Sequence, residues 1–208
     1  MTVILLTGFE PFDGAARNPS ADAVEAVAAG YDGPHTLVAA NLPVAFERSA
    51  MLLRQLIGQH DPDVIVATGL AGGSERIAVE RIGVNLMDAR IPDNDGAQPV
   101  DLPSERGGPA ARFSTLPVKR LVNLLGEAGL PARSSLSAGS YVCNHVLYTA
   151  LGAAGPRSRA GFVHLSWSHG TAPEGSASLA DENLALAVRL VVDHALDDED
   201  DEPGGSVW

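Results

Sequence analysis

The sequence predicts a single α/β domain in which a mostly parallel, twisted sheet carries helices on both faces. Three observations indicate this fold: predicted strands and helices alternate along the chain, no Ser/Gly/Pro-rich linker divides its 208 residues, and the run Val64-Ile-Val-Ala67 is continuously apolar. Parallel strands are joined by helical crossovers and are buried on both faces, so alternation and unbroken apolar strands are expected together.

The first half of the chain begins with a buried strand over residues 3–7. Asn18-Pro19 is typical of a helix start, because asparagine caps the first N–H groups and proline is tolerated at the first helical position. A second strand is predicted over residues 37–41, and the apolar run from Val64 forms a third. Two helices are marked by apolar residues on one face, the first by Val24, Val27, Ala28 and Tyr31, the second by Phe46, Ala50, Leu53 and Ile57.

The second half continues the alternation around a long irregular stretch. A longer strand is predicted over residues 77–86, followed by a proline- and glycine-rich excursion over 89–112. Further strands are predicted over 136–143 and 161–165. Ser178-Leu-Ala-Asp181 is predicted to be a capping box that opens the last helix. Apolar stripes mark three helices: Val118, Leu121, Val122 and Leu125; Val146, Leu147 and Ala150; and Leu184, Val188, Val191 and Ala195.

Charge and cysteine content restrict the possible partners and compartment. The net charge is −12, which disfavours nucleic acid and anionic membranes as partners. Residues 197–202 contribute six of the negative charges, so we expect residues 197–208 to be a disordered acidic tail after a domain of residues 1–196. A lone cysteine and the lack of a basic or long apolar leader predict a cytoplasmic protein.

Cys143, the only cysteine, is the candidate nucleophile. It lies where a predicted helix begins, and the unpaired N–H groups and the helix dipole there favour a thiolate. His164 follows within the apolar run of residues 161–165, where it is a candidate base. The alternative is that Cys143 is a small buried hydrophobe and that His164 is bonded to backbone groups.

Glu80 completes a candidate catalytic set. Strand alternation places it on the same face as the apolar Ile82, Val84 and Leu86, where a carboxylate is costly unless it is paired. Glu80 either turns to solvent, pairs with a neighbouring arginine (Arg76 or Arg81), or orients a histidine. In the last case Cys143, His164 and Glu80 form a nucleophile, base and orienting residue.

Two other kinds of site are disfavoured. A metal site built from His164, His169, Asp93 and Asp95 would use two histidines five residues apart, a spacing unsuited to one helical face. Residues 69–73 are glycine-rich but lack the Gly-Lys-Ser/Thr ending of a phosphate-binding loop. The sequence therefore predicts no metal and no cofactor.

Five segments resemble one known family. They are Thr7-Gly-Phe-Glu-Pro-Phe-Asp-Gly14 leading into Asn18-Pro-Ser20; Val79-Glu-Arg-Ile-Gly-Val-Asn85; Asp88-Ala-Arg-Ile-Pro-Asp-Asn94 with Gln98-Pro-Val100; Ala138-Gly-Ser-Tyr-Val-Cys-Asn-His145; and Gly161-Phe-Val-His164. Together, in this order and spacing from residue 3 to about 165, they resemble the pyroglutamyl peptidase I (pyrrolidone-carboxylate peptidase) family of cytosolic cysteine peptidases.

The resemblance implies an enzyme that hydrolyses the bond after an N-terminal pyroglutamyl residue through a thioester. It implies Cys143 as nucleophile, His164 as base and then acid, and Glu80 as the residue that orients His164. It also implies peptide substrates with blocked N-termini and a homotetramer. The walls of its substrate pocket would be Phe9, Phe12, Ile91 and Val142.

Two polar residues near this predicted pocket have alternative roles. Asn18 either reads the lactam or only caps a helix, and Arg90 either polarises the scissile carbonyl or pairs with Asp88 or Asp93. The backbone N–H of Cys143 is the first candidate for an oxyanion donor.

The chain departs from the usual family pattern at a few positions. Asp13 stands where glycine is common, and Leu70 where many bacterial members have glutamine and others an apolar residue. After His164 the chain reads Leu165-Ser-Trp-Ser168, where the family often has a proline and an aromatic residue. A catalytically inactive relative that binds blocked peptide N-termini is the alternative function, although it would have no need of all three catalytic residues.

Overall fold

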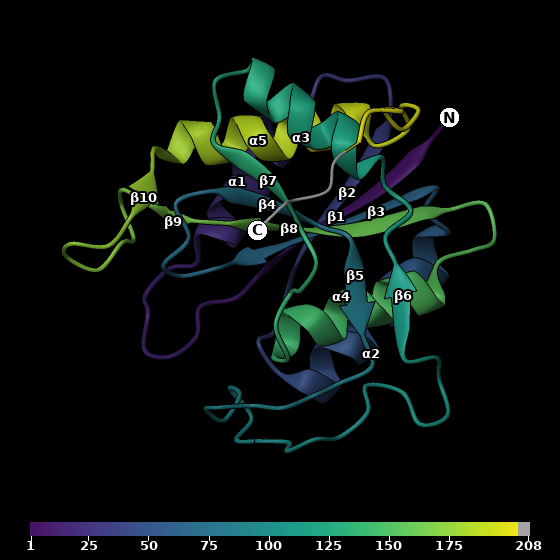
Figure 1. The fold of residues 1–208 in the computed structure, drawn as a ribbon, viewed down its shortest axis with the longest axis vertical. Coiled ribbons are helices and arrows are strands. Elements are labelled where there is room, and N and C mark those ends of the chain that lie inside the picture. The colour runs from purple at the N-terminus through teal and green to yellow at the C-terminus, as the bar shows by residue number, and fades with distance from the viewer. Residues whose placement is uncertain (204–208) are drawn as a thin grey trace.

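The computed structural model of the chain describes residues 1–203, and its centre is a six-stranded sheet (Figure 1). The strand order is β2-β1-β3-β8-β4-β7. Every neighbouring pair is parallel except β4 and β8, which are antiparallel. The strands span Thr36–Leu42 (β2), Val3–Phe9 (β1), Val64–Leu70 (β3), Arg159–Leu165 (β8), Ile77–Glu80 (β4) and Ala132–Ser135 (β7). The predicted α/β fold with a mostly parallel sheet is confirmed.

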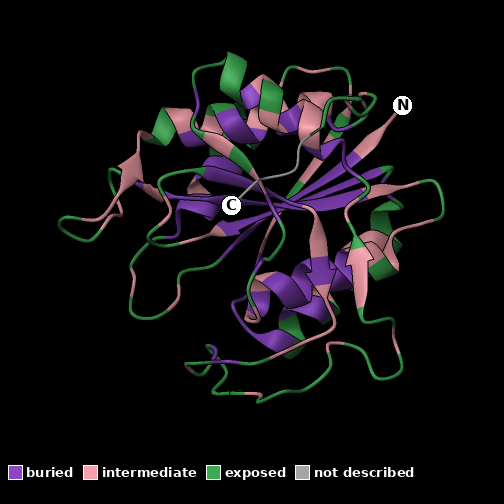
Figure 2. Cartoon of the chain, in the orientation of Figure 1, coloured by how far each residue is buried: buried purple, intermediate pink, exposed green. Residues whose placement is uncertain are grey.

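Helices cover both faces of this sheet (Figure 1). On one face lie α1 (Pro19–Gly30), α3 (Val118–Glu127) and α5 (Asp181–His194), and on the other lie α2 (Phe46–His60) and α4 (Val142–Ala153). The central strands are buried nearly throughout, as Figure 2 shows, which explains why their sequences are apolar without alternation. No helix within residues 1–203 has the length and apolar character needed to cross a bilayer.

Three local predictions were wrong. The strand predicted over 77–86 is broken at Arg81, whose N–H donates to Ser135 and whose carbonyl accepts from Ser114. Its two parts are β4 and β5 (Ile82–Val84), and β5 pairs with β6 (Ala111–Phe113) in a separate sheet. In the strand predicted over 136–143, residues 136–141 are instead a loop and Val142 and Cys143 already belong to α4, because the residues that pair with β4 are those of β7.

The predicted capping box is the third error. Ser178 lies in β10 (Ser178–Leu179), which pairs with β9 (Trp167–Ser168), and α5 begins after Ala180 without a side-chain cap. Ser178, which the local sequence would assign to a helix cap, is therefore part of a strand pair instead. The cap predicted at Asn18 is confirmed, since its side chain accepts from the Ser20 N–H at 3.1 Å.

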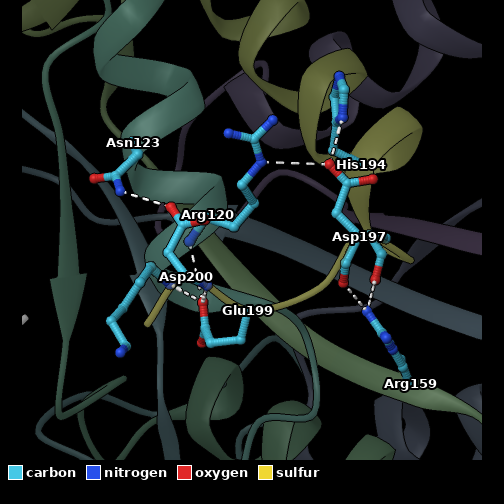
Figure 3. Close-up of polar contacts among 9 residues, drawn as sticks. Arg120, Asn123, Arg159, His194, Asp197, Glu199 and Asp200 are labelled. Atoms are coloured by element: carbon cyan, nitrogen blue, oxygen red, sulfur yellow. Dashed lines mark hydrogen bonds and ion pairs between the residues drawn. The ribbon is translucent and has the colours of Figure 1, made fainter. Parts of the chain in front are cut away.

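The acidic segment after α5 contacts α3 in this structure (Figure 3). The Glu199 carboxylate accepts from the N–H groups of Lys119 and Arg120, at 2.8 and 3.1 Å, where α3 has no side-chain cap of its own. Asp200 accepts from Asn123 at 2.7 Å. These contacts favour a docked arrangement for residues 197–202, whereas residues 204–208 lie outside the described part. The domain boundary at 196 and the disorder of the tail stay predictions.

Candidate active site

The candidate catalytic residues lie at the carboxyl edge of the parallel strands. The sheet register places Gly69, His164, Ala78 and Arg133 in one row across β3, β8, β4 and β7. In these strands the residues directly before and after the row point to the opposite face of the sheet and pack with α1, α3 and α5. The row itself therefore faces α2 and α4. Cys143, the second residue of α4, lies above the row. Strand pairing thus brings together residues from four distant segments.

Glu80 and His164 form a buried hydrogen-bonded pair. A Glu80 carboxylate oxygen lies 2.8 Å from His164 Nδ1, and the two residues are 1% and 7% exposed. An ionised carboxylate can only accept, so Nδ1 carries the proton and Nε2 is left to act as a base. Of the roles considered for Glu80, the structure shows the pairing with a histidine rather than exposure to solvent.

His164 has a strongly perturbed pKa. Burial lowers the pKa, but hydrogen bonding and charge from the neighbouring Cys143 and Glu80 side chains outweigh burial and raise it to about 9. An imidazole that gains a proton this readily is suited to accept one from a thiol and to hold it as an imidazolium beside a thiolate. Perturbed pKa values of this kind cluster at functional sites.

The N-terminus of α4 presents unpaired donors at Cys143. The cap residue Tyr141 makes no side-chain cap bond, and the first backbone bond of the helix runs from the His145 N–H to the Tyr141 carbonyl. The N–H groups of Val142 and Cys143 have no acceptor among residues 1–203. They remain available for an anion, at the positive end of the helix dipole.

Close approach of Cys143 to the sheet depends on Gly69. A Cβ at residue 69 would lie 3.0 Å from Cys143 Sγ and 2.8 Å from the Phe162 ring. Any side chain larger than hydrogen would therefore push the thiol or the ring away. The glycine-rich stretch of residues 69–73 thus allows the backbone to come close to the sulfur, which is a role unrelated to phosphate binding.

A cavity of about 290 Å³ opens beside the three candidate catalytic residues. Of the residues predicted to bind substrate, Phe9, Phe12, Asn18 and Val142 line it. Asn18 Oδ1 is engaged in capping α1, and one Nδ2 hydrogen bonds to the Glu10 carbonyl at 3.0 Å. The second amide hydrogen of Asn18 is therefore the one that remains for a ligand.

Two predicted residues do not line this cavity. Arg90 and Ile91 are absent from its lining within residues 1–203, and the Arg90 carbonyl instead accepts from Gln98. The alternative pairing of Arg90 with Asp88 or Asp93 is not seen in that part of the chain either. The substrate roles of Arg90 and Ile91 stay predictions.

Sequence reasoning missed several lining residues, among them Val44, Tyr141 and Arg133. Arg133 carries no local signal, because its place in the row follows from the pairing of β7 with β4. Tyr141 directly precedes α4. Burial, followed by the charges of Asp93, Cys143 and Asp13, raises the pKa of Tyr141 to about 12, so this phenol stays protonated and donates to the Pro92 carbonyl at 3.0 Å.

Two departures from the family pattern acquire a physical meaning. Asp13 has φ of 50°, a left-handed conformation that glycine adopts without strain and aspartate tolerates. Leu70 lines the cavity, so the apolar residue at this position enlarges the apolar part of the wall.

The residues of the disfavoured metal site lie in other interactions. Asp93 accepts from the Phe46 N–H at 2.8 Å and so caps α2, which lacks a cap of its own. Asp95 forms an ion pair with Arg48 at 2.6 Å, and His164 is held by Glu80. These contacts give Asp93, Asp95 and His164 structural partners, whereas His169 is exposed.

Comparison with known proteins gives one consistent result. The family described as pyroglutamyl peptidase (peptidase C15) matches residues 2–197. The chain is 48% identical over 170 residues to the pyrrolidone-carboxylate peptidase of Clavibacter michiganensis, covering 81% of this chain and 80% of the relative. It is 46% identical over 196 residues to that of Streptomyces coelicolor, covering 92% and 91%.

Solved structures agree with the sequence relatives. The pyroglutamyl peptidase I of Bacillus amyloliquefaciens superimposes with a TM-score of 0.92 at 38% identity, covering 98% of this chain and 99% of the other. The pyrrolidone carboxyl peptidase of Thermococcus litoralis does so with a TM-score of 0.92 at 34% identity, covering 98% and 100%. The similarity therefore extends over nearly the whole fold.

Proposed function

The chain belongs to the pyroglutamyl peptidase family, and from this premise we propose that it releases N-terminal pyroglutamate from peptides through a Cys143–His164–Glu80 triad and a thioester intermediate. The observation that carries the proposal is the 2.8 Å contact between Glu80 and His164 Nδ1, in a cavity that also contains Cys143. This arrangement supplies a nucleophile, a base and an orienting residue in one place.

The first half of the reaction forms the thioester. His164 Nε2 takes the Cys143 proton, and the thiolate attacks the carbonyl that joins pyroglutamate to the next residue. The N–H groups at the start of α4 stabilise the oxyanion, and one such donor typically contributes about a hundredfold or more in rate. The C–N bond then breaks as His164 protonates the departing amine.

The second half releases the product. Water attacks the thioester carbonyl and gives a proton to His164. The C–S bond then breaks, Cys143 leaves and takes this proton back from His164, and pyroglutamic acid is released. Glu80 keeps its hydrogen bond to Nδ1 throughout and stabilises the imidazolium that forms in each half.

The cavity explains why a blocked N-terminus would be required. Pyroglutamate is small and uncharged, which suits walls made by Phe9, Phe12 and Val142. The free amide hydrogen of Asn18 is a donor for the lactam carbonyl. An N-terminal ammonium would lose its hydration in this apolar site without gaining a counter-ion, since Glu80 is already paired with His164.

A matched pair of substrates tests this function. Pyroglutamyl-aminomethylcoumarin should be hydrolysed, whereas glutaminyl-aminomethylcoumarin, which has a free ammonium, should react at least about a hundredfold more slowly. The measurement is kcat/KM for each substrate by coumarin fluorescence with reduced enzyme. Similar rates on the two substrates would contradict the proposed pocket.

The row of residues beneath Cys143 gives a second prediction. Gly69→Ala should lower kcat about a hundredfold, because the new Cβ displaces the thiol or the Phe162 ring from its position. Gly58→Ala is the matched control, since a Cβ at this site in α2 meets no atom within 4 Å. The steric explanation fails if Gly69→Ala has the kcat of the Gly58→Ala protein.

The alternative of an inactive binding protein is disfavoured. A binding protein gains nothing from a buried Glu80–His164 pair beside a cysteine at a helix N-terminus, whereas a hydrolase uses all three groups. A homotetrameric assembly, a cytoplasmic location and a contribution of Arg90 to carbonyl polarisation stay predictions.

A further inference from the structure

We infer that Arg133 recognises a carboxylate on the leaving part of the substrate, so that the enzyme favours pyroglutamyl dipeptides with a free carboxyl group over their amides. This inference rests on the proposed function and adds a specificity that the triad and the lactam pocket do not supply. It concerns the side of the site that receives the departing amine.

The sheet register places Arg133 on that side. His164, Ala78 and Arg133 are direct partners on three adjacent strands, and all three line the cavity. The spacing between neighbouring strands puts the backbone of Arg133 about 10 Å from that of His164. Ala78, the residue between them, has too small a side chain to fill this space.

The two ends of the cavity have different chemistry. Phe9 lies at the end of β1, on the far side of β3 and β8 from Arg133. If the pyroglutamyl ring occupies the aromatic end, the bond to be cleaved lies at Cys143 and His164. The next residue of the substrate then extends toward β4 and β7, where its carboxylate comes within reach of the long Arg133 side chain.

Arg133 is chemically available for this role. It is the one arginine or lysine among the described lining residues, and it makes no ion pair within residues 1–203. Glu80, the only carboxylate among the lining residues within 1–203, is held by His164. A guanidinium matches a carboxylate with two parallel hydrogen bonds.

Because the protein is strongly negative overall, a local cation has a larger effect on the binding of an anionic substrate. With a net charge of −12, the chain repels an anionic peptide at long range. A single exposed arginine at the rim opposes this repulsion where the leaving group binds. Both effects weaken as salt is added, because the Debye length shortens to about 3 Å at 1 M.

The test compares pyroglutamyl-alanine with pyroglutamyl-alanine amide. The readout is the ratio of kcat/KM for the acid to that for the amide, which cancels any loss common to both substrates. Arg133→Gln should lower this ratio about three- to fivefold at low salt, as expected for an exposed charge pair. Arg133→Glu should lower it further, and the difference from wild type should shrink at 1 M salt.

Arg157→Gln is the matched control. Arg157 is exposed and precedes β8, at the opposite edge of the sheet from the site. Its replacement therefore changes the net charge as much as Arg133→Gln does, without altering the side of the site that receives the departing amine. The inference is overturned if Arg133→Gln keeps the wild-type ratio, or if Arg157→Gln lowers it as much. Absence of turnover of both the acid and the amide by the wild-type enzyme would instead refute the proposed function.

Discussion

Cys143→Ser should abolish turnover of pyroglutamyl-aminomethylcoumarin, lowering kcat by about four orders of magnitude or more. The proposed mechanism needs a thiolate that His164 generates and that later leaves as a thioester is hydrolysed. A serine hydroxyl in the same place is a far weaker acid, and the site is organised around the larger sulfur atom, which contacts the Gly69 position. The measurement is the initial rate at matched folded concentration.

Two observations separate chemistry from folding in this experiment. The melting temperature of the variant should stay close to that of the wild type, because Cys143 is only partly buried and the change replaces one atom. Iodoacetamide should inactivate the wild type with one equivalent bound at Cys143, the only thiol of the chain. Activity retained in Cys143→Ser, or after complete alkylation, would refute a thiol mechanism.

Glu80→Gln should lower kcat by about 10² to 10⁴-fold and shift its pH dependence. Glutamine has nearly the same shape, but its neutral amide no longer stabilises the imidazolium by charge, and its NH2 group can donate to Nδ1 and favour the wrong tautomer. Burial lowers the pKa of His164, and the contacts with Cys143 and Glu80 together raise it to about 9. Loss of the carboxylate removes one raising influence, so the pKa of His164 should fall.

The sign of the pH effect follows from the role of the imidazolium. Protonation of the departing amine requires the charged form of His164, which is lost as pH rises through its pKa. The basic limb of the wild-type profile should therefore lie near pH 9, and that of Glu80→Gln at lower pH. The raised pKa also contributes stability that is fully present below about pH 6.5 and lost as pH rises toward 9.

The measurement is kcat against pH for the wild type, Glu80→Gln and Glu127→Gln. Glu127 lies at the end of α3, remote from the cavity, so this control loses a carboxylate without changing the site. An unchanged basic limb in Glu80→Gln would show that Glu80 does not set the pKa of His164. A loss of activity with an unchanged limb would leave only a positioning role.

The fold was largely predictable because its signals are local. Strand and helix periodicities are visible within windows of about ten residues, and the Asn18-Pro19 start depends only on adjacent atoms. The errors occur where pairing overrides the local pattern. Residues 77–86 read as one strand, yet the hydrogen bonds of Arg81 to two other segments split them between two sheets.

The residues of the candidate site were predictable, but their contacts were predictable only in part. Cys143, His164 and Glu80 were singled out by residue type, place in the pattern and family resemblance, and the structure puts all three on one cavity. Glu80 has the partner that a buried carboxylate requires, but it does not share a face with Ile82 and Val84 as strand alternation predicted, since both belong to the separate sheet. The local pattern around Glu80 does not identify its partner, because His164 lies 84 residues away, and only the family resemblance indicates the pairing.

The order of strands and helices, the start of α1 and the identity of the candidate nucleophile can all be predicted from local sequence, since they depend on neighbours within a few residues. Two features become visible only in the folded chain: Gly69, His164, Ala78 and Arg133 share a row, and Asp93 and Glu199 cap helices that lack caps of their own. The physical reason is that strand register and distant capping are set by packing and hydrogen bonding between segments far apart in the chain.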